Sequence, residues 1–212
     1  MYRLLFFMLL LQIQIVSAAD TKYINPQVKL ETEKGDILIE LFPKLAPVTV
    51  DNFIQHVNDY HYDGLIFHRV MRDFMIQTGG FTFDFTPRET IQPSIVNESK
   101  NGLKNLRGTI SMARLSEPNS AKAQFFINHK DNSFLDSDGQ NFGYAVFGMV
   151  IRGMQIVHMI ATVKTTNRGP YQNVPIEPIR IIRARLISSG SWIPSKSRET
   201  SKPKLERPTP LK

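Results

Sequence analysis

The segment 62–79 brings together side chains that could bind a ligand with one polar and one apolar part. Arg69 supplies a permanent cation with a planar fork of donors, Gln77 supplies an amide, and Phe74 and Met75 supply apolar surface. Apolar and polar residues roughly alternate through this segment, which is typical of a strand interrupted by a turn. We therefore expect Arg69, Met75 and Gln77 to project from one face of a sheet, with the cation beside an apolar platform.

This combination suits an X-Pro peptide bond, because a prolyl ring needs an apolar slot while the neighbouring amide groups need fixed donors. Rotation about a peptide bond faces a barrier of roughly 18–20 kcal/mol from amide resonance. X-Pro bonds still populate the cis form, and uncatalysed exchange takes tens to hundreds of seconds. A guanidinium aimed at the prolyl nitrogen would stabilise the twisted amide more than the planar one, which is the condition for lowering the barrier.

The same segment resembles the signature of the cyclophilin family of peptidyl-prolyl cis-trans isomerases. The resemblance covers about residues 26 to 187 and is closest to the bacterial periplasmic or secreted branch, given the runs at 131–136 and 169–175. Four further family-like runs follow in the expected order, at 108–114, 124–128, 134–136 and 142–148. Ordered motifs at compatible spacings are hard to obtain by chance.

The resemblance implies a role for each of a set of residues. Arg69 would stabilise the twisted amide, Gln77 would orient Arg69 and hold a substrate carbonyl, and Phe74 would belong to the catalytic pocket. The substrate-binding residues implied are Met75, Ala113, Arg114, Gln124, Phe126, Phe134, Leu135 and Tyr144. Of these, Ala113, Arg114 and Gln124 would line the groove for residues before the proline.

Three positions depart from the pattern of many relatives. Phe134 stands where cyclosporin-sensitive relatives carry tryptophan, Tyr144 where they carry histidine, and Arg114 where many carry asparagine. Phenylalanine lacks the indole N–H donor. We therefore expect catalysis to persist, Arg114 to add charge without removing the backbone contact, and cyclosporin to bind only weakly.

The two ends of the chain differ from its centre in composition. Residues 1–19 have the positive start, apolar core and small-residue end of a secretory signal peptide, and the apolar run is too short to span a bilayer comfortably. A short lead-in, 20–27, would precede an isomerase domain at 28–188. Residues 189–212 form a basic Pro/Ser-rich segment that we expect to be disordered. Cleavage after Ala18 or Ala19 would give a periplasmic or secreted protein without stable membrane insertion.

The centre of the chain predicts a mainly β fold. Helical spacing of apolar residues predicts helices at about 49–58 and 153–161, and a hairpin is expected at 28–41. Other strand-like runs fall at 65–71, 74–78, 94–98, 108–114, 123–128, 145–150 and 176–187. The pattern suggests a closed or nearly closed antiparallel barrel. The cyclophilin resemblance implies a closed barrel of eight antiparallel β-strands capped by two α-helices.

Composition excludes several kinds of chemistry. The 212-residue chain has no cysteine, so disulfides, thiol nucleophiles and Cys-type zinc sites are excluded. The histidines do not follow a metal-binding spacing, and we expect no metal and no cofactor. The net charge of +7 raises nucleic acid as a partner, but much of that charge lies in the C-terminal segment, which has no interleaved aromatic residues. We expect no nucleic-acid partner.

The sequence therefore predicts a peptidyl-prolyl isomerase that acts as a monomer on proline-containing, unfolded or partly folded polypeptides. One alternative is a cyclophilin-like chaperone whose groove only binds Pro-containing peptides, with incidental catalysis. Another is a host-directed or surface-interaction module in which the basic segment carries the activity. A protease-coupled isomerisation assay separates the enzyme from the binder, and deletion of 190–212 tests the third possibility.

Overall fold

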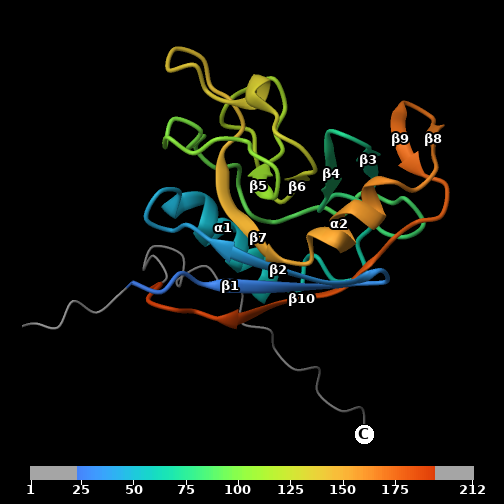
Figure 1. Ribbon diagram of the computed structural model, residues 1–212, viewed down its shortest axis with the longest axis horizontal. Coiled ribbons are helices and arrows are strands. Elements are labelled where there is room, and N and C mark those ends of the chain that lie inside the picture. Colours follow the sequence, from blue (N-terminus) through green and yellow to red (C-terminus); the bar gives the residue numbers. More distant parts are fainter. Residues whose placement is uncertain (1–22, 194–212) are drawn as a thin grey trace, which may run out of the picture.

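The computed structural model describes residues 23–193, and the elements are arranged around one eight-stranded sheet (Figure 1). The helices are α1 (Pro47–Asn58) and α2 (Met154–Ala161), and a single 3-10 turn, η1, spans Ser133–Leu135. The strands of the large sheet are β1 (Gln27–Thr32), β2 (Gly35–Leu41), β3 (Arg69–Met71), β4 (Met75–Thr78), β5 (Thr109–Met112), β6 (Phe125–Asn128), β7 (Val146–Arg152) and β10 (Ile181–Ser188). Strands β8 (Thr165–Arg168) and β9 (Tyr171–Pro175) form a separate hairpin.

The large sheet is an open half-barrel with the strand order β10-β1-β2-β7-β5-β6-β4-β3, and every neighbouring pair is antiparallel. The expected closed barrel is therefore wrong, although the mainly β architecture with two helices is confirmed. Residues 64–67 precede the short strand β3 and meet residues 179–181 through isolated hydrogen bonds, such as Phe67 N–H to the Ile179 carbonyl at 3.0 Å. These bonds bring the two edges together without continuing the ladder.

Alternating burial explains the long strands on one side of the molecule. In β1, Val28 and Leu30 are fully buried and alternate with half-buried polar residues, and β2 repeats the pattern with Ile37 and Ile39. Such alternation favours a sheet with one face on the core. The two strands pair in register through a tight turn, as the sequence predicts for this hairpin.

The two helices pack on the core, and contacts from distant segments determine where each helix begins. Ala46, at the N-terminal end of α1, has no capping side chain, and the Glu98 carboxylate instead accepts hydrogen bonds from the N–H groups of Val48 (3.1 Å) and Thr49 (2.8 Å). A carboxylate near the first turn also interacts favourably with the helix dipole. Helix α2 begins after Gly153, whose φ of 102° places it in the left-handed region. A Cβ at Gly153 would collide with the carbonyl oxygen of Asp36.

Three expected strands differ in the structure. The segment 94–98 forms no strand, because Ile95 makes only an isolated bridge with Ala121 and the Asn97 side chain donates to the Pro118 and Gly143 carbonyls of neighbouring loops. The run 65–71 becomes a strand only from Arg69 onward, and the run 176–187 only from Ile181. The β8–β9 hairpin was not expected, since the polar sequence of β8 lacks a strand-like apolar pattern. In Figure 1 it projects at one end of the molecule, next to β3.

The ordered contacts of the domain continue past residue 188, where the sequence analysis placed its boundary. Trp192 is half-buried, packs against the main core, and donates from Nε1 to the Asp51 carboxylate on α1 at 2.8 Å. The expected signal peptide, part of the lead-in and most of the basic segment lie outside the described residues. Within 23–193, no helix is long and apolar enough to cross a membrane.

Candidate functional site

The register of three strands places Arg69, Gln77 and Phe126 in one row. Arg69 on β3 lies opposite Gln77 on β4, and Gln77 lies opposite Phe126 on β6. Cross-strand partners share a face of a sheet, so the three side chains project together. The alternate row of Val70, Ile76 and Ile127 is buried in the main core. One face of this antiparallel segment therefore packs in the main core, and the other face lines the groove.

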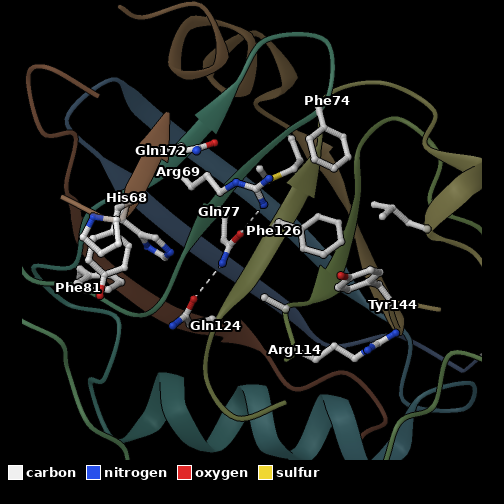
Figure 2. Close-up of a pocket in the computed structure, with 15 residues that line it drawn as sticks. His68, Arg69, Phe74, Gln77, Phe81, Arg114, Gln124, Phe126, Tyr144 and Gln172 are labelled. Atoms are coloured by element: carbon white, nitrogen blue, oxygen red, sulfur yellow. Dashed lines mark hydrogen bonds between the residues drawn. The ribbon is translucent and has the colours of Figure 1, made fainter. Parts of the chain in front are cut away.

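A chain of polar contacts crosses the floor of this groove (Figure 2). Arg69 Nη1 lies 3.5 Å from Gln77 Oε1, and Gln77 Nε2 donates to Gln124 Oε1 at 2.9 Å. Because the Gln77 amide donates to Gln124, its oxygen is turned toward the guanidinium. The three side chains thus determine one another's orientation.

Arg69 is further restrained by apolar neighbours. Its Nη2 contacts Met71 Sδ at 3.4 Å, and its Cζ lies 5.8 Å from the centroid of the Phe74 ring. Arginine interacts favourably with an aromatic face within about 6 Å. Since Gln77 satisfies only part of the guanidinium fork, other N–H groups are available to a ligand.

The apolar part of the site is a small cluster that is separate from the main core. Met75, Phe126 and Leu135 are buried, and Phe74, Ala113 and Tyr144 pack against them. The Phe126 and Tyr144 rings make an edge-to-face contact at 5.6 Å. Figure 2 shows Phe126 beside the Arg69–Gln77 contact and Tyr144 on the other side of Phe126. The arrangement gives an apolar slot with a cation at its rim.

The slot and the polar chain belong to one surface cavity of about 580 Å³. Ten of its lining residues were predicted from the sequence: Arg69, Phe74, Met75, Gln77, Ala113, Arg114, Gln124, Phe126, Leu135 and Tyr144. A volume of this size is typical of a ligand-binding cleft. The structure thus brings together, in one cleft, residues from five separate parts of the chain.

Phe134 is placed differently from the other predicted residues. Its side chain does not line the cavity, is 72% exposed, and stacks on Phe74 with 5.5 Å between ring centroids. It therefore supports Phe74 from outside the cleft. A ligand that extends beyond the slot would be needed to reach it.

Arg114 lines the cavity but has most of its donors occupied. Its Nε donates to the Gly143 carbonyl at 3.1 Å and its Nη2 to the Phe142 carbonyl at 2.9 Å, while its Cζ lies 4.8 Å from the Tyr144 ring centroid. The guanidinium therefore ties the loop before β7 to the groove wall. It contributes shape to the site more than a free charge.

His68 is a neutral group behind the arginine. Burial and, to a lesser extent, the neighbouring Arg69 charge together lower the pKa of His68 to about 4, although hydrogen bonds to the Ile66 backbone and the Gln124 side chain oppose the shift. Its Nδ1 is buried without a hydrogen-bond partner among the described residues. A histidine in this state is neutral near pH 7 and has no imidazolium proton to donate there.

Sequence reasoning did not assign five residues that line the cavity: His68, Phe81, Pro170, Tyr171 and Gln172. Three of them sit at the turn and first residues of the β8–β9 hairpin. The Gly-Pro pair at 169–170 is a turn signal that could have indicated this hairpin. No local pattern indicates, however, that the hairpin folds back beside β3.

No group of three or more histidine, aspartate or glutamate side chains within residues 23–193 is arranged to hold a metal ion. The site consists of a guanidinium, amides and apolar side chains. Its chemistry is therefore orientation and hydrogen bonding beside an apolar slot.

Comparison with known proteins agrees with this geometry. Residues 27–186 match the family model described as cyclophilin type peptidyl-prolyl cis-trans isomerase/CLD. The chain is 52% identical to peptidyl-prolyl cis-trans isomerase A of Dickeya dadantii over 77% of this chain and 85% of that protein. It is 47% identical to peptidyl-prolyl cis-trans isomerase B of Escherichia coli over 73% of this chain and 95% of that protein.

A solved structure also matches. The cyclophilin type isomerase of Cryptosporidium parvum, crystallised in the presence of the dipeptide Ala-Pro, superposes with a TM-score of 0.63 at 27% identity, over 76% of this chain and 99% of that one. The family match spans nearly all of the described residues and includes every strand that builds the cleft. This chain belongs to the cyclophilin-type family of peptidyl-prolyl cis-trans isomerases.

Proposed function

We propose that this isomerase rotates X-Pro bonds in unfolded or partly folded polypeptides, with Arg69 as the group that stabilises the twisted amide. The observation that carries the proposal is the position of the Arg69 guanidinium, held by Gln77 at the rim of the slot formed by Met75, Phe126 and Leu135. A prolyl ring in this slot would present its amide to the arginine. The Ala-Pro dipeptide used with the Cryptosporidium relative supports a ligand of this kind.

The energetic argument rests on differential binding. In the planar amide the nitrogen lone pair is delocalised, whereas in the twisted state it becomes available to accept a hydrogen bond. A donor fixed by Gln77 therefore gains more from the twisted state than from either planar isomer, and only such gains accelerate the step. Each 1.36 kcal/mol of differential stabilisation corresponds to about tenfold in rate.

The slot contributes by holding one end of the rotating bond. A ring buried against Phe126 and Met75 cannot turn with the rest of the chain, so rotation is confined to the residue before the proline. The prolyl ring also loses apolar surface to the slot, which contributes about 25 cal/mol per Å² to binding. Binding and catalysis thus share the same apolar contacts.

The test is a protease-coupled assay of cis-to-trans conversion in a short X-Pro peptide. Wild-type protein should accelerate conversion. The kcat/KM of Arg69→Ala should be lower by about a hundredfold or more, which is the effect of removing one preorganised transition-state donor. Arg69→Lys should recover little, because a point charge does not reproduce the planar fork. Near-wild-type activity in an Arg69→Ala protein with a native circular dichroism spectrum would refute the role of Arg69.

For its setting in the cell, we propose export to the periplasm or the medium, action as a monomer, and weak binding of cyclosporin. The signal-like residues 1–19 support export. Fractionation of cells, followed by N-terminal sequencing of the protein, tests this point. A new N-terminus at residue 19 or 20 is expected, and an uncleaved cytoplasmic protein would contradict it.

A further inference from the structure

A group of three aromatic rings lies beside the cleft, outside the slot that takes the proline. Phe81 stacks on Phe85 at 4.7 Å between centroids, and Tyr171 makes edge-to-face contacts of 5.1 Å with each of them. We call Phe81, Phe85 and Tyr171 the aromatic cluster. It joins the loop after β4 to the β8–β9 hairpin.

The cluster is held by a tight turn. The backbone N–H of Phe85 donates to the Thr82 carbonyl at 2.9 Å, and the N–H of Thr82 donates to the Thr86 carbonyl at 2.9 Å. Phe85 has a φ of 71°, in the left-handed region, which a bulky residue adopts only when its surroundings impose it. The Asp84 carboxylate accepts hydrogen bonds from Thr82 and Thr86, which lower the pKa of Asp84 and keep it ionised. The rings are therefore positioned before any ligand arrives.

One arginine packs against this cluster. Arg168 Cζ lies 4.5 Å from the Phe85 ring centroid, and its Nη2 donates to the Asp84 carbonyl at 3.1 Å. These contacts tie the β8–β9 hairpin to the turn that carries Phe85.

Part of this aromatic surface remains open. Tyr171 is 40% exposed and Phe85 is half-buried, whereas Phe81 is buried. Phe81 and Tyr171 also line the cleft itself, so the open surface continues directly from it. In Figure 2, Phe81 lies across the Arg69–Gln77–Gln124 contacts from Phe126. A chain bound with its proline against Phe126 can extend over the cluster.

We propose that the aromatic cluster forms a second binding surface for an aromatic or large apolar side chain of the same client polypeptide, within three residues of the proline. The inference rests on the proposed function, because the client is the chain whose proline occupies the slot. Such side chains are exposed in unfolded polypeptides and mostly buried in folded ones. The surface would therefore favour clients that have not yet folded.

The test compares peptides that differ only in where an aromatic residue lies. Seven peptides are needed: a reference Ala-Ala-Ala-Pro-Ala-Ala-Ala sequence, and six in which phenylalanine replaces one alanine at each position. Exchange spectroscopy by NMR gives kcat/KM for each without a protease whose own specificity would interfere. We expect at least one position at which phenylalanine raises kcat/KM about two- to tenfold, the range of a single aromatic contact.

Variants of the surface decide whether it causes that gain. Tyr171→Ala and Phe85→Ala should each reduce the ratio of the phenylalanine peptide to the reference toward one, while Tyr171→Phe should keep it. Tyr60→Ala is the matched control, because Tyr60 is also an exposed ring under an arginine but lies outside the cleft lining. Its ratio should equal that of the wild type.

The outcomes separate this inference from the proposed function. If the reference peptide is not isomerised by the wild type, the proposed function fails. If the reference is isomerised but no position shows a gain, or the gain survives in both alanine variants, the second surface is refuted. The latter result would mean that the cluster only attaches the hairpin to the domain.

Discussion

Gln77 lies directly opposite Arg69 in the β3–β4 ladder, and its side-chain oxygen faces the guanidinium because its amide nitrogen donates to Gln124. The 3.5 Å contact to Arg69 is at the long end for a hydrogen bond, whereas the 2.9 Å contact to Gln124 is ordinary. The arginine is thus oriented by an amide that is itself held from the far side. A ligand can still compete for the guanidinium.

This relationship predicts the effect of Gln77 substitutions. Gln77→Leu keeps similar volume but removes the oxygen that orients Arg69, so kcat should fall about tenfold, corresponding to 1.4 kcal/mol of lost transition-state stabilisation. KM should change less, because the apolar slot remains. The measurement is a full kinetic curve for an X-Pro peptide. Gln55→Leu on α1 is a matched control away from the cleft, and loss of kcat in both variants would contradict a specific role for Gln77.

The activity should vary little between about pH 6 and 9. A guanidinium stays protonated in this range, and the pKa of His68, lowered to about 4 mainly by burial, leaves that histidine neutral throughout. Initial rates at constant ionic strength across this range test the point. A bell-shaped profile centred near pH 7 that disappears in His68→Gln would instead make His68 an acid–base participant.

Folding stability, unlike activity, should depend on His68 at acidic pH. The pKa of His68 is lowered in the folded protein, so below pH 6.5 the unfolded chain takes up a proton that the folded chain refuses until about pH 4. The stabilisation from neutral His68 is therefore complete above pH 6.5 and is lost as pH falls toward 4. Between pH 7 and 5 this amounts to about 2 kcal/mol of unfolding free energy.

Urea titrations of wild type and His68→Gln at pH 7 and pH 5 measure this contribution. The wild type should lose about 2 kcal/mol more than the variant on acidification. Burial also lowers the pKa values of His61 and His129, but both remain in the variant, so the difference isolates His68. Equal losses in the two proteins would show that His68 is not buried in its neutral form.

Cyclosporin should inhibit the wild type weakly and Phe134→Trp more strongly. Phe134 is exposed and stacks on Phe74, so an indole can replace its ring without entering the core and can present an N–H donor to the drug. An unpaired acceptor costs roughly 1–3 kcal/mol, which is about tenfold to a hundredfold in affinity. Titration of both proteins in the same isomerase assay gives the result. Tight inhibition of the wild type, or no gain in the variant, would exclude Phe134 as the discriminating residue.

A metal chelator and a thiol-blocking reagent should each leave the isomerase activity unchanged. The proposed step forms no covalent bond, and the chain contains no cysteine for a thiol reagent to modify. Initial rates with EDTA, and separately with iodoacetamide, should match the untreated protein within error. A rate that collapses with EDTA and returns on adding zinc would overturn the noncovalent mechanism.

The sequence by itself determined the family and most of the cleft. Alternation around Arg69 and Gln77 correctly placed both on one face of a sheet, because side-chain direction in a strand follows from local periodicity. The motifs at 108–114 and 124–128 indicated Ala113, Arg114, Gln124 and Phe126, which the structure brings into the same cavity. The two helices also followed from apolar spacing.

Only the tertiary structure decided the features that depend on contacts between distant segments. Between β3 and β10, residues 64–67 and 179–181 meet only through isolated hydrogen bonds, so the ladder does not continue and the sheet stays open. No local sequence pattern encodes that meeting. Likewise, Glu98 stabilises the start of α1 from a loop that the sequence suggested was a strand. The side chain of Phe134 lies outside the slot for the same reason, since exposure depends on what packs around a residue. Periodicity sets the direction of a side chain, whereas long-range packing sets its surroundings.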